Sequence, residues 1–175
     1  MKFAIKAAMV LSVLALAACN NPDKFGGAGG MGVNDPGGMY GDGTIDQAGI
    51  SDPNSPAYFQ QTIGDKILFL VDQSTISPDA RTILMQQASW LVAHPGYTAI
   101  IEGHADEQGT REYNLALGAR RANSVEQFLI SQGVSANRLR TVSYGKERPL
   151  AVCSTESCYS KNRRAVTVIA QGAGA

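Results

Sequence analysis

The chain has 175 residues, 44% of them hydrophobic, with 15 basic and 15 acidic side chains. Removal of Lys2 and Lys6, which precede an apolar run near the start, leaves 13 basic residues against 15 acidic ones, a net charge of −2. A chain without a basic excess lacks the positive stripe that nucleic-acid binding requires. We therefore predict no nucleic-acid partner, and a length that suffices for one compact domain with additional segments.

Residues 1–18 have the layout of a secretory signal peptide. Lys2 and Lys6 form a positive start, and residues 7–17 form an apolar run that stops directly at Cys19. A transmembrane anchor is the weaker interpretation, because a span needs about 20 apolar residues. The tetrapeptide ending at Cys19 resembles the bacterial lipobox, which implies cleavage and lipidation of Cys19. The alternative is an ordinary secretory signal followed by a chance cysteine.

The three cysteines support this interpretation. An odd number in an exported protein leaves one thiol to explain, and lipidation of Cys19 would account for it. Cys153 and Cys158 then remain as a pair that we expect to form a disulfide in an oxidising compartment. A metal half-site is the alternative, but it would need two further ligands and none lies nearby. We expect no metal and no cofactor.

The composition changes after the predicted signal. Residues 19–58 are rich in glycine, with scattered Asp and Pro and few apolar residues in any periodic pattern. Such a segment buries too little surface to offset the entropy of ordering it. We predict a flexible linker, with a root-mean-square span on the order of 35 Å for 40 residues. The folded domain is then expected in residues 59–172.

Strands and helices alternate along this domain. Ser77 is a predicted N-cap before Pro78, and Gly133 is placed to end the second helix. The predicted strands are 66–71, 97–102, 139–144 and 164–169, and the predicted helices begin at Ser77 and Arg111 and end at His94 and Gln132. This order predicts an α/β (α+β) two-layer sandwich, with a mixed four-stranded sheet and helices on one face.

Two adjacent arginines on the second predicted helix differ in their surroundings. Arg120 and Arg121 project about 100° apart. Leu117, Val125 and Phe128 lie on the side of Arg121, whereas the side of Arg120 is polar. Arg120 is therefore expected in solvent. Arg121 lies within an apolar stripe, where an unpaired charge is costly, so we expect a carboxylate partner from the protein or from a ligand.

Asp106 is the leading candidate for that partner. It follows the second predicted strand, and ligands of open α/β sheets bind beyond the carboxyl ends of strands. Gly103 and Gly109 bracket the loop and allow a tight backbone path. An Asp and an Arg in one cleft suit a free amino-acid centre, which carries an ammonium and a carboxylate on the same carbon. A plain Asp106–Arg121 salt bridge between loop and helix is the equally weighted alternative.

The run D-x2-G-x3-Y-N-x2-L-x3-R-R-A, from Asp106 to Ala122, and the later YSKNRRAVTV resemble the OmpA-like C-terminal domain family. The lipobox and linker make the chain similar to the peptidoglycan-associated lipoprotein branch of that family, part of the Tol–Pal system. The resemblance covers roughly residues 67–169. It implies non-covalent binding of the diaminopimelate in peptidoglycan stem peptides, whose side-chain end is a free amino-acid centre.

The resemblance also implies roles for individual residues. Arg121 would pair with the diaminopimelate carboxylate, and Asp106 would hold the ammonium. Asn114 and Leu117 would line the pocket. Asp72 carries over from the first strand, but Val71 stands where the family has phenylalanine, so the aromatic wall is open. The expected setting is an outer-membrane lipoprotein facing the periplasm, which tethers the membrane to the cell wall with TolB and other Tol-system proteins as partners.

Two other functions remain to be weighed. One is a metal-dependent cell-wall amidase that would use His94, His104 and Asp106. It lacks a clear third metal ligand, and no serine or cysteine has an identifiable base. The other is a scaffold in which the charged pair is only structural. We expect a binding protein rather than an enzyme.

Overall fold

The computed structural model describes residues 47–171. The predicted signal peptide, Cys19 and most of the predicted linker lie outside these residues. Among the described residues no helix is long and apolar enough to cross a membrane. All of the elements below belong to one compact unit.

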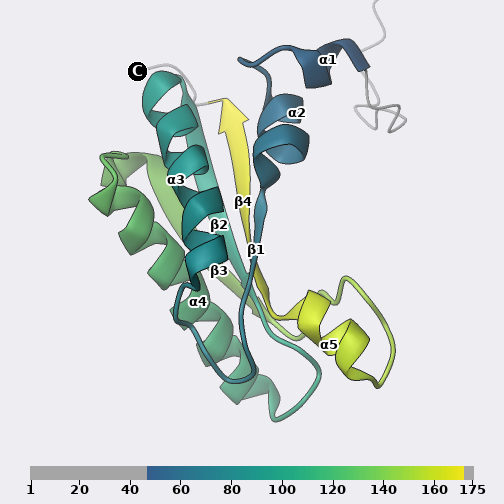
Figure 1. Cartoon of the computed structure of the whole chain (residues 1–175). Coiled ribbons are helices and arrows are strands. Elements are labelled where there is room, and N and C mark those ends of the chain that lie inside the picture. The colour runs from purple at the N-terminus through teal and green to yellow at the C-terminus, as the bar shows by residue number, and fades with distance from the viewer. Residues whose placement is uncertain (1–46, 172–175) are drawn as a thin grey trace, which may run out of the picture. The chain divides into compact units, whose positions relative to one another are not determined.

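The sheet has four strands, β1 (Lys66–Leu68), β2 (Tyr97–His104), β3 (Leu139–Gly145) and β4 (Arg164–Gln171). Their order is β1-β4-β2-β3 (Figure 1). β2 and β3 are parallel, whereas β4 runs antiparallel to both β1 and β2. The mixed four-stranded sheet predicted from the sequence is therefore confirmed.

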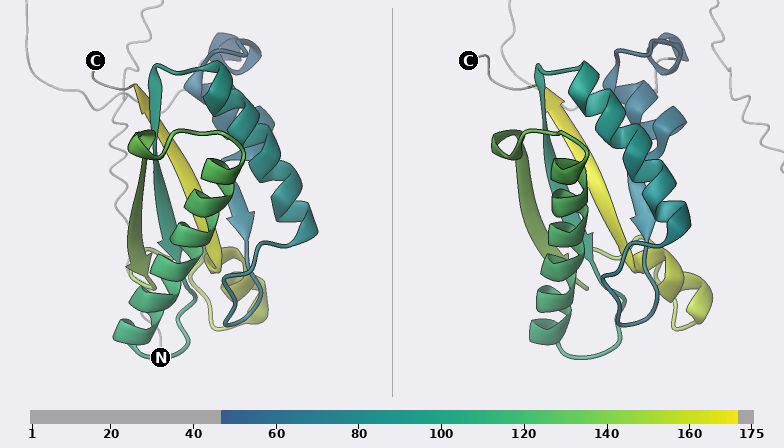
Figure 2. Two further views of the ribbon diagram at one scale, coloured as in Figure 1. Left: turned by 90° about the vertical axis from the view of Figure 1, so that its left-hand side faces the viewer. Right: turned by 60° about the vertical axis from the view of Figure 1, so that its left-hand side comes forward.

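Two long helices, α3 (Pro78–Ala93) and α4 (Arg111–Ser131), cover one face of this sheet (Figure 2). The side chain of Ser77 accepts a hydrogen bond from the Ala80 amide, as its predicted N-cap role requires. Gly133 follows α4 with a φ of 98°, a left-handed conformation that favours glycine at a helix end. The core between the layers includes Leu84, Ile101 and Leu129, all fully buried.

The contact between α4 and β2 depends on two glycines. A Cβ atom at Gly103 would lie 1.8 Å from the carbonyl oxygen of Gly118, and one at Gly118 would lie 2.4 Å from Oγ of Ser143. Neither position has room for a side chain. The close approach brings the carboxyl end of β2, where Asp106 follows, against the middle of α4, where Arg121 lies.

The structure differs from the sequence prediction in the first strand and before it. β1 ends at Leu68, three residues early, because the chain beyond Phe69 enters a turn in which the Gln73 amide donates to the Leu70 carbonyl. Two short helices, α1 (Gln47–Ser51) and α2 (Pro56–Tyr58), and the π-helical turn η1 (Phe59–Gly64) precede β1. The helices α1 and α2 fall inside the segment predicted as linker.

The order before β1 comes from a tertiary contact. The indole of Trp90 on α3 donates a 2.7 Å hydrogen bond to the Pro53 carbonyl, and its ring packs on Phe59. The side chain of Ser55 caps α2. The glycine-rich composition of the preceding segment concealed these anchors.

The loop between β3 and β4 also contains an element that the sequence did not indicate, the helix α5 (Glu156–Asn162). Cys153 and Cys158 form a disulfide there, with their Cα atoms 5.7 Å apart. A short 3-10 turn, η2 (Ala136–Arg138), precedes β3. In Figure 1, α5 lies at the end of the sheet where β2 terminates, close to the start of β4.

Candidate binding site

A charged cleft of about 250 Å³ opens beyond the carboxyl end of β2, between the turn after β1 and the first half of α4. All five residues predicted to bind a ligand line it, namely Asp72, Asp106, Asn114, Leu117 and Arg121. The rest of the lining is Val71, Gln108, Gly109 and Tyr113. We refer to these nine residues as the charged cleft.

Arg121 forms the buried floor of the charged cleft, with 0% of its surface exposed. Its Nε donates to the Gln73 carbonyl at 2.8 Å, and its terminal nitrogens donate to the carbonyls of His104 at 2.7 Å and Leu70 at 3.1 Å. A guanidinium has five N–H groups. One N–H on each terminal nitrogen therefore remains without a partner among the described residues.

The electrostatic environment of Arg121 mixes burial with charge. Burial lowers its pKa to about 10 and Arg163 and Arg120 act in the same direction, whereas Asp106 and Asp72 oppose the shift. The side chain is still a cation at neutral pH. Its guanidinium also lies 5.2 Å from the centre of the Phe69 ring, a favourable cation–π contact. Arg120, as expected, is exposed.

Asp72 is aimed by a turn that Arg121 clamps. Leu70 and Gln73, whose carbonyls accept from Arg121, flank Asp72 on either side. Asp72 has a φ of 57°, a left-handed conformation that aspartate tolerates better than most residues. Its carboxylate accepts a hydrogen bond from the hydroxyl of Tyr113. Arg121 thus sets the backbone that presents Asp72, in addition to lining the cleft itself.

The partner of Asp106 is not the one predicted. Among the described residues Arg121 forms no ion pair, and the carboxylate of Asp106 instead contacts Nη1 of Arg163 at 3.1 Å. The Asp106–Arg121 salt bridge, one of the two alternatives weighed from the sequence, is therefore absent, and Arg121 donates to backbone carbonyls instead. Both Asp106 and Arg163 are buried, at 7% and 4% exposure. The absence of this salt bridge also contradicts the alternative in which it served only to tie the loop to the helix.

The loop after β2 is pinned at several points. Asp106 accepts from the Gln108 amide at 3.3 Å, and the Asn114 side chain donates to the Gln108 carbonyl at 2.7 Å. Gly109 has a φ of 90°, so a side chain there would be strained. Lys146 donates to the Gly109 carbonyl at 2.8 Å. The loop therefore presents Asp106 in a defined position.

The proposed metal set of the amidase alternative does not come together. His94 precedes β2 and His104 ends it, so the eight-residue strand separates them by about 23 Å. His94 stacks on Trp90, and His104 packs against Tyr144. Among residues 47–171, no group of three or more His, Cys, Asp or Glu side chains has a metal-binding arrangement.

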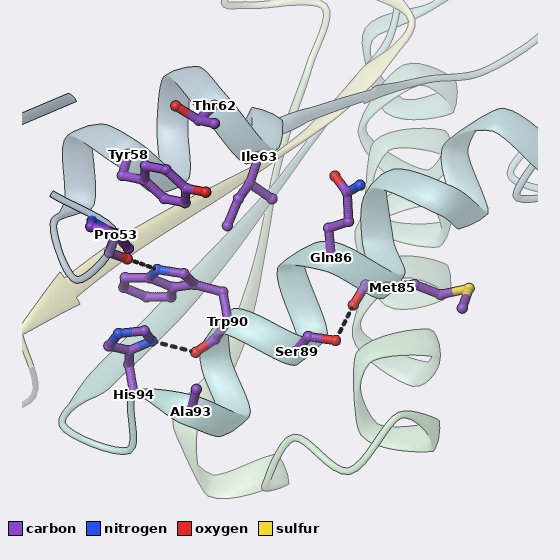
Figure 3. A pocket seen from close by; sticks show the side chains of 10 residues that line it. All are labelled: Pro53, Tyr58, Thr62, Ile63, Met85, Gln86, Ser89, Trp90, Ala93 and His94. Carbon is purple, nitrogen blue, oxygen red and sulfur yellow. Dashed lines mark hydrogen bonds between the residues drawn. The ribbon is translucent and has the colours of Figure 1, made fainter. Parts of the chain in front are cut away.

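A larger, apolar cavity of about 660 Å³ lies away from the charged cleft, between α3 and the segment before β1 (Figure 3). Trp90 and His94 form one wall, and Tyr58 and Ile63 face them from α2 and η1. No ionised carboxylate or guanidinium lines it. Its size exceeds that of the charged cleft, but it offers no opposed charges for a zwitterion.

Sequence reasoning missed three contributors to the site. Arg163 holds Asp106, Glu156 holds Arg163, and Tyr113 both lines the cleft and bonds Asp72. A signal for Arg163 was present, since it directly precedes a buried strand and a charged residue there needs a partner. The structure also bears on the aromatic wall. Val71, which stands where the family has phenylalanine, lines the cleft, and Tyr113 supplies an aromatic ring in the same lining.

A mixed four-stranded sheet covered by two helices, with a charged cleft at the end of its central parallel strand, defines an OmpA-like domain. The OmpA family model matches residues 68–163. The crystal structure of the peptidoglycan-associated lipoprotein from Burkholderia pseudomallei is similar, with a TM-score of 0.62 and 37% identity over 69% of this chain and 98% of that one. The C-terminal domain of Helicobacter pylori MotB, at 25% identity, has a TM-score of 0.58 over 62% of this chain and 86% of its own.

Curated relatives extend the similarity along the chain. The peptidoglycan-associated lipoprotein of Mesorhizobium japonicum is 48% identical over 165 residues, covering 94% of this chain and 90% of the relative. That of Agrobacterium fabrum is 51% identical over 168 residues, covering 95% and 87%. The chain belongs to the OmpA family and, within it, to the peptidoglycan-associated lipoproteins.

Proposed function

We propose that the protein binds, without a covalent bond, the diaminopimelate of peptidoglycan stem peptides in the charged cleft. The observation that carries the proposal is the presence of two carboxylates, Asp72 and Asp106, and the Arg121 guanidinium in the lining of one cleft. The side-chain end of diaminopimelate presents one ammonium and one carboxylate. Opposite charges held in place by other bonds need no further ordering when such a group arrives.

Each side chain has a distinct part in this binding. Asp106 and Asp72 attract the ammonium. Arg121 attracts the carboxylate through its charge and its remaining N–H groups, and it also fixes the turn that carries Asp72. Asn114 fixes the loop of Asp106, and Leu117 supplies an apolar wall. The protein's proposed role is non-covalent binding, in which no covalent bond is made or broken.

The same proposal covers the protein's place in the envelope. A lipidated Cys19 would hold the chain on the periplasmic side of the outer membrane, and the binding domain would reach the cell wall across the preceding segment. Stable anchoring requires more than one acyl chain, which a bacterial lipoprotein terminus supplies. The protein thereby tethers outer membrane to cell wall, supporting envelope integrity and cell division. Fractionation of cells that express a Cys19→Ser variant tests this part, because loss of the lipid should release the chain from the membrane.

Tol-system proteins, TolB first among them, are the expected protein partners. The family resemblance supports this expectation. Co-purification of TolB with the full-length chain, with and without added sacculi, tests it. Failure of TolB to co-purify under both conditions would contradict the partner assignment and leave the peptidoglycan proposal intact.

Binding of the full-length chain, solubilised in detergent, to purified sacculi tests the central proposal. We expect Arg121→Lys to weaken binding about tenfold or more, because lysine keeps the charge but cannot make the forked set of hydrogen bonds. Arg120→Lys is the matched control on the neighbouring, exposed side chain and should bind as the parent does. Equal binding by Arg121→Lys and the parent, with both folded, would show that the charged cleft is not the peptidoglycan-binding site.

A further inference from the structure

We propose that Glu156, within the disulfide-closed loop, is a positioning residue for the ammonium half of the charged cleft. Glu156 balances the positive charge of Arg163, so the negative charge of Asp106 remains available to attract the ammonium of the ligand. This inference rests on the proposed function and assigns a further residue to it. Glu156 lies outside the lining of the cleft and acts through Arg163.

The geometry places one buried cation between two carboxylates. Nη1 of Arg163 lies 3.1 Å from Oδ2 of Asp106 and 3.2 Å from Oε2 of Glu156, while Nη2 donates to the other oxygen of Glu156. Nε of Arg163 donates to the Phe69 carbonyl at 3.3 Å, which ties the guanidinium to the end of β1. The side chain of Arg163 is 5% exposed, so it cannot turn towards solvent.

The charge balance follows from this arrangement. Arg163 paired with Asp106 alone would form a neutral pair, and a neutral pair attracts an ammonium weakly. With Glu156 the three side chains carry a net charge of −1. The hydrogen bond between Arg163 and Glu156 is the largest cause that lowers the pKa of Glu156 and raises that of Arg163, so both stay ionised. Because Asp106 lines the cleft and Glu156 faces outward, the surplus negative charge is available to the ligand.

The loop holds Glu156 in place although its side chain is 67% exposed. Glu156 lies inside the ring closed by Cys153 and Cys158 and begins α5. At the other end of α5, the fully buried Asn162 accepts from the amides of Leu150 and Ala151 at 2.7 and 3.0 Å. The disulfide ring and Asn162 thus hold the two ends of α5. Because its backbone is already fixed, Glu156 loses little further freedom when it pairs with Arg163.

The test measures affinity of the full-length chain for two synthetic stem peptides. One carries meso-diaminopimelate, and the other carries 2-aminopimelate, which keeps the distal carboxylate but lacks the distal ammonium. We expect Glu156→Gln to weaken binding of the diaminopimelate peptide about three- to tenfold, since one charge of a hydrogen-bonded network is removed. Binding of the 2-aminopimelate peptide should change less than about twofold, because it makes no use of Asp106.

Two further variants make the result decisive. Glu156→Asp keeps the charge and should restore most of the affinity, and Glu147→Gln removes an equivalent carboxylate that pairs with Arg111 at the exposed surface and should change neither affinity. An equal loss for both peptides would identify a purely structural role and overturn the inference, as would parental affinity in Glu156→Gln. If the parent itself fails to bind the diaminopimelate peptide, the proposed function falls instead.

Discussion

The two cavities of the domain differ in what lines them. The cavity beside Trp90 is more than twice the size of the charged cleft, yet its lining is mostly apolar and includes no carboxylate or guanidinium. The charged cleft is small, and its side chains are held by hydrogen bonds to backbone carbonyls, to one another and to Arg163. Cavity size therefore does not identify the binding site here. We propose that fixed opposite charges do, because they would recognise a zwitterion specifically.

Two arginines make the same contrast at the level of single residues. Arg138 donates to the carbonyls of Leu91, His94 and Tyr97 beside the apolar cavity, and Arg121 donates to three carbonyls beneath the charged cleft. Both join separate segments of backbone. Only Arg121 has carboxylates of a cleft beside it, so only Arg121 is expected to combine a structural role with binding.

The largest expected effect comes from replacing these two arginines. Arg121→Ala should lower the free energy of unfolding by about 3 to 5 kcal/mol, because it removes three hydrogen bonds to backbone carbonyls together with a fully buried side chain. It should also abolish sacculus binding. Arg138→Ala should destabilise the domain by a smaller amount, since Arg138 is half-buried, and should leave binding unchanged. Urea unfolding and sacculus co-sedimentation measure both, and loss of binding in Arg138→Ala would break the contrast.

The end of the domain that carries the charged cleft, where β2 ends at His104, is also expected to be its acid-sensitive end. Burial, reinforced by Arg164 and Arg148, lowers the pKa of His104 from 6.5 to about 4. The unfolded chain therefore takes up a proton between pH 6.5 and 4 that the folded domain does not, so stability falls as the pH falls through this range. The full loss would be about 3 kcal/mol.

Unfolding of the parent and of His104→Phe at a series of pH values between 7 and 4 measures this effect. The difference in slope isolates His104 from the carboxylates that titrate in the same range. Identical slopes would show that His104 is not the acid-sensitive group. Hydrogen exchange should locate the opening near His104 and Asp106, away from Trp90.

Asp106→Asn should have an intermediate effect that appears in binding. The substitution keeps the shape of the side chain, and Arg163 retains Glu156 as a partner. We expect affinity for a diaminopimelate stem peptide to fall about 10- to 100-fold, with a change in unfolding free energy below about 1 kcal/mol. Titration calorimetry measures the affinity. A binding loss that tracks a loss of stability would mean that Asp106 only maintains the fold.

The smallest effect on peptide affinity is expected at the apolar cavity. Trp90→Phe removes the indole hydrogen bond to Pro53 and should cost about 1 to 3 kcal/mol of stability. Affinity for the stem peptide should be unchanged, because the residue contributes nothing to the charged cleft. A fall in affinity in this variant, at a temperature where it is folded, would show that the two cavities are coupled.

Much of the fold was readable because its signals are local. Ser77 and Pro78 begin α3 and Gly133 ends α4, where caps and backbone conformation act within a few residues. The apolar stripe around Arg121 correctly indicated a buried face. The placement of Asp106 in a cleft beyond the end of β2 likewise followed from the general rule that ligands of open sheets bind beyond the carboxyl ends of strands.

The ion pairs could not be predicted from the sequence. Arg163 is 57 residues from Asp106, and the two meet only because β4 lies beside β2. The candidate partner, Arg121, instead donates three hydrogen bonds to carbonyls of the turn after β1 and the end of β2. A sequence shows that a buried charge needs a partner, but not which one.

The sequence by itself thus determined the sheet, its helical layer, and five of the nine residues that line the charged cleft. The tertiary structure decided how those residues are held, through Arg163, Glu156 and the turn clamped by Arg121. The physical reason is one of range. Caps, turns and amphipathic periodicity are decided among neighbours along the chain, whereas the pairing of buried charges depends on which distant strands are brought side by side.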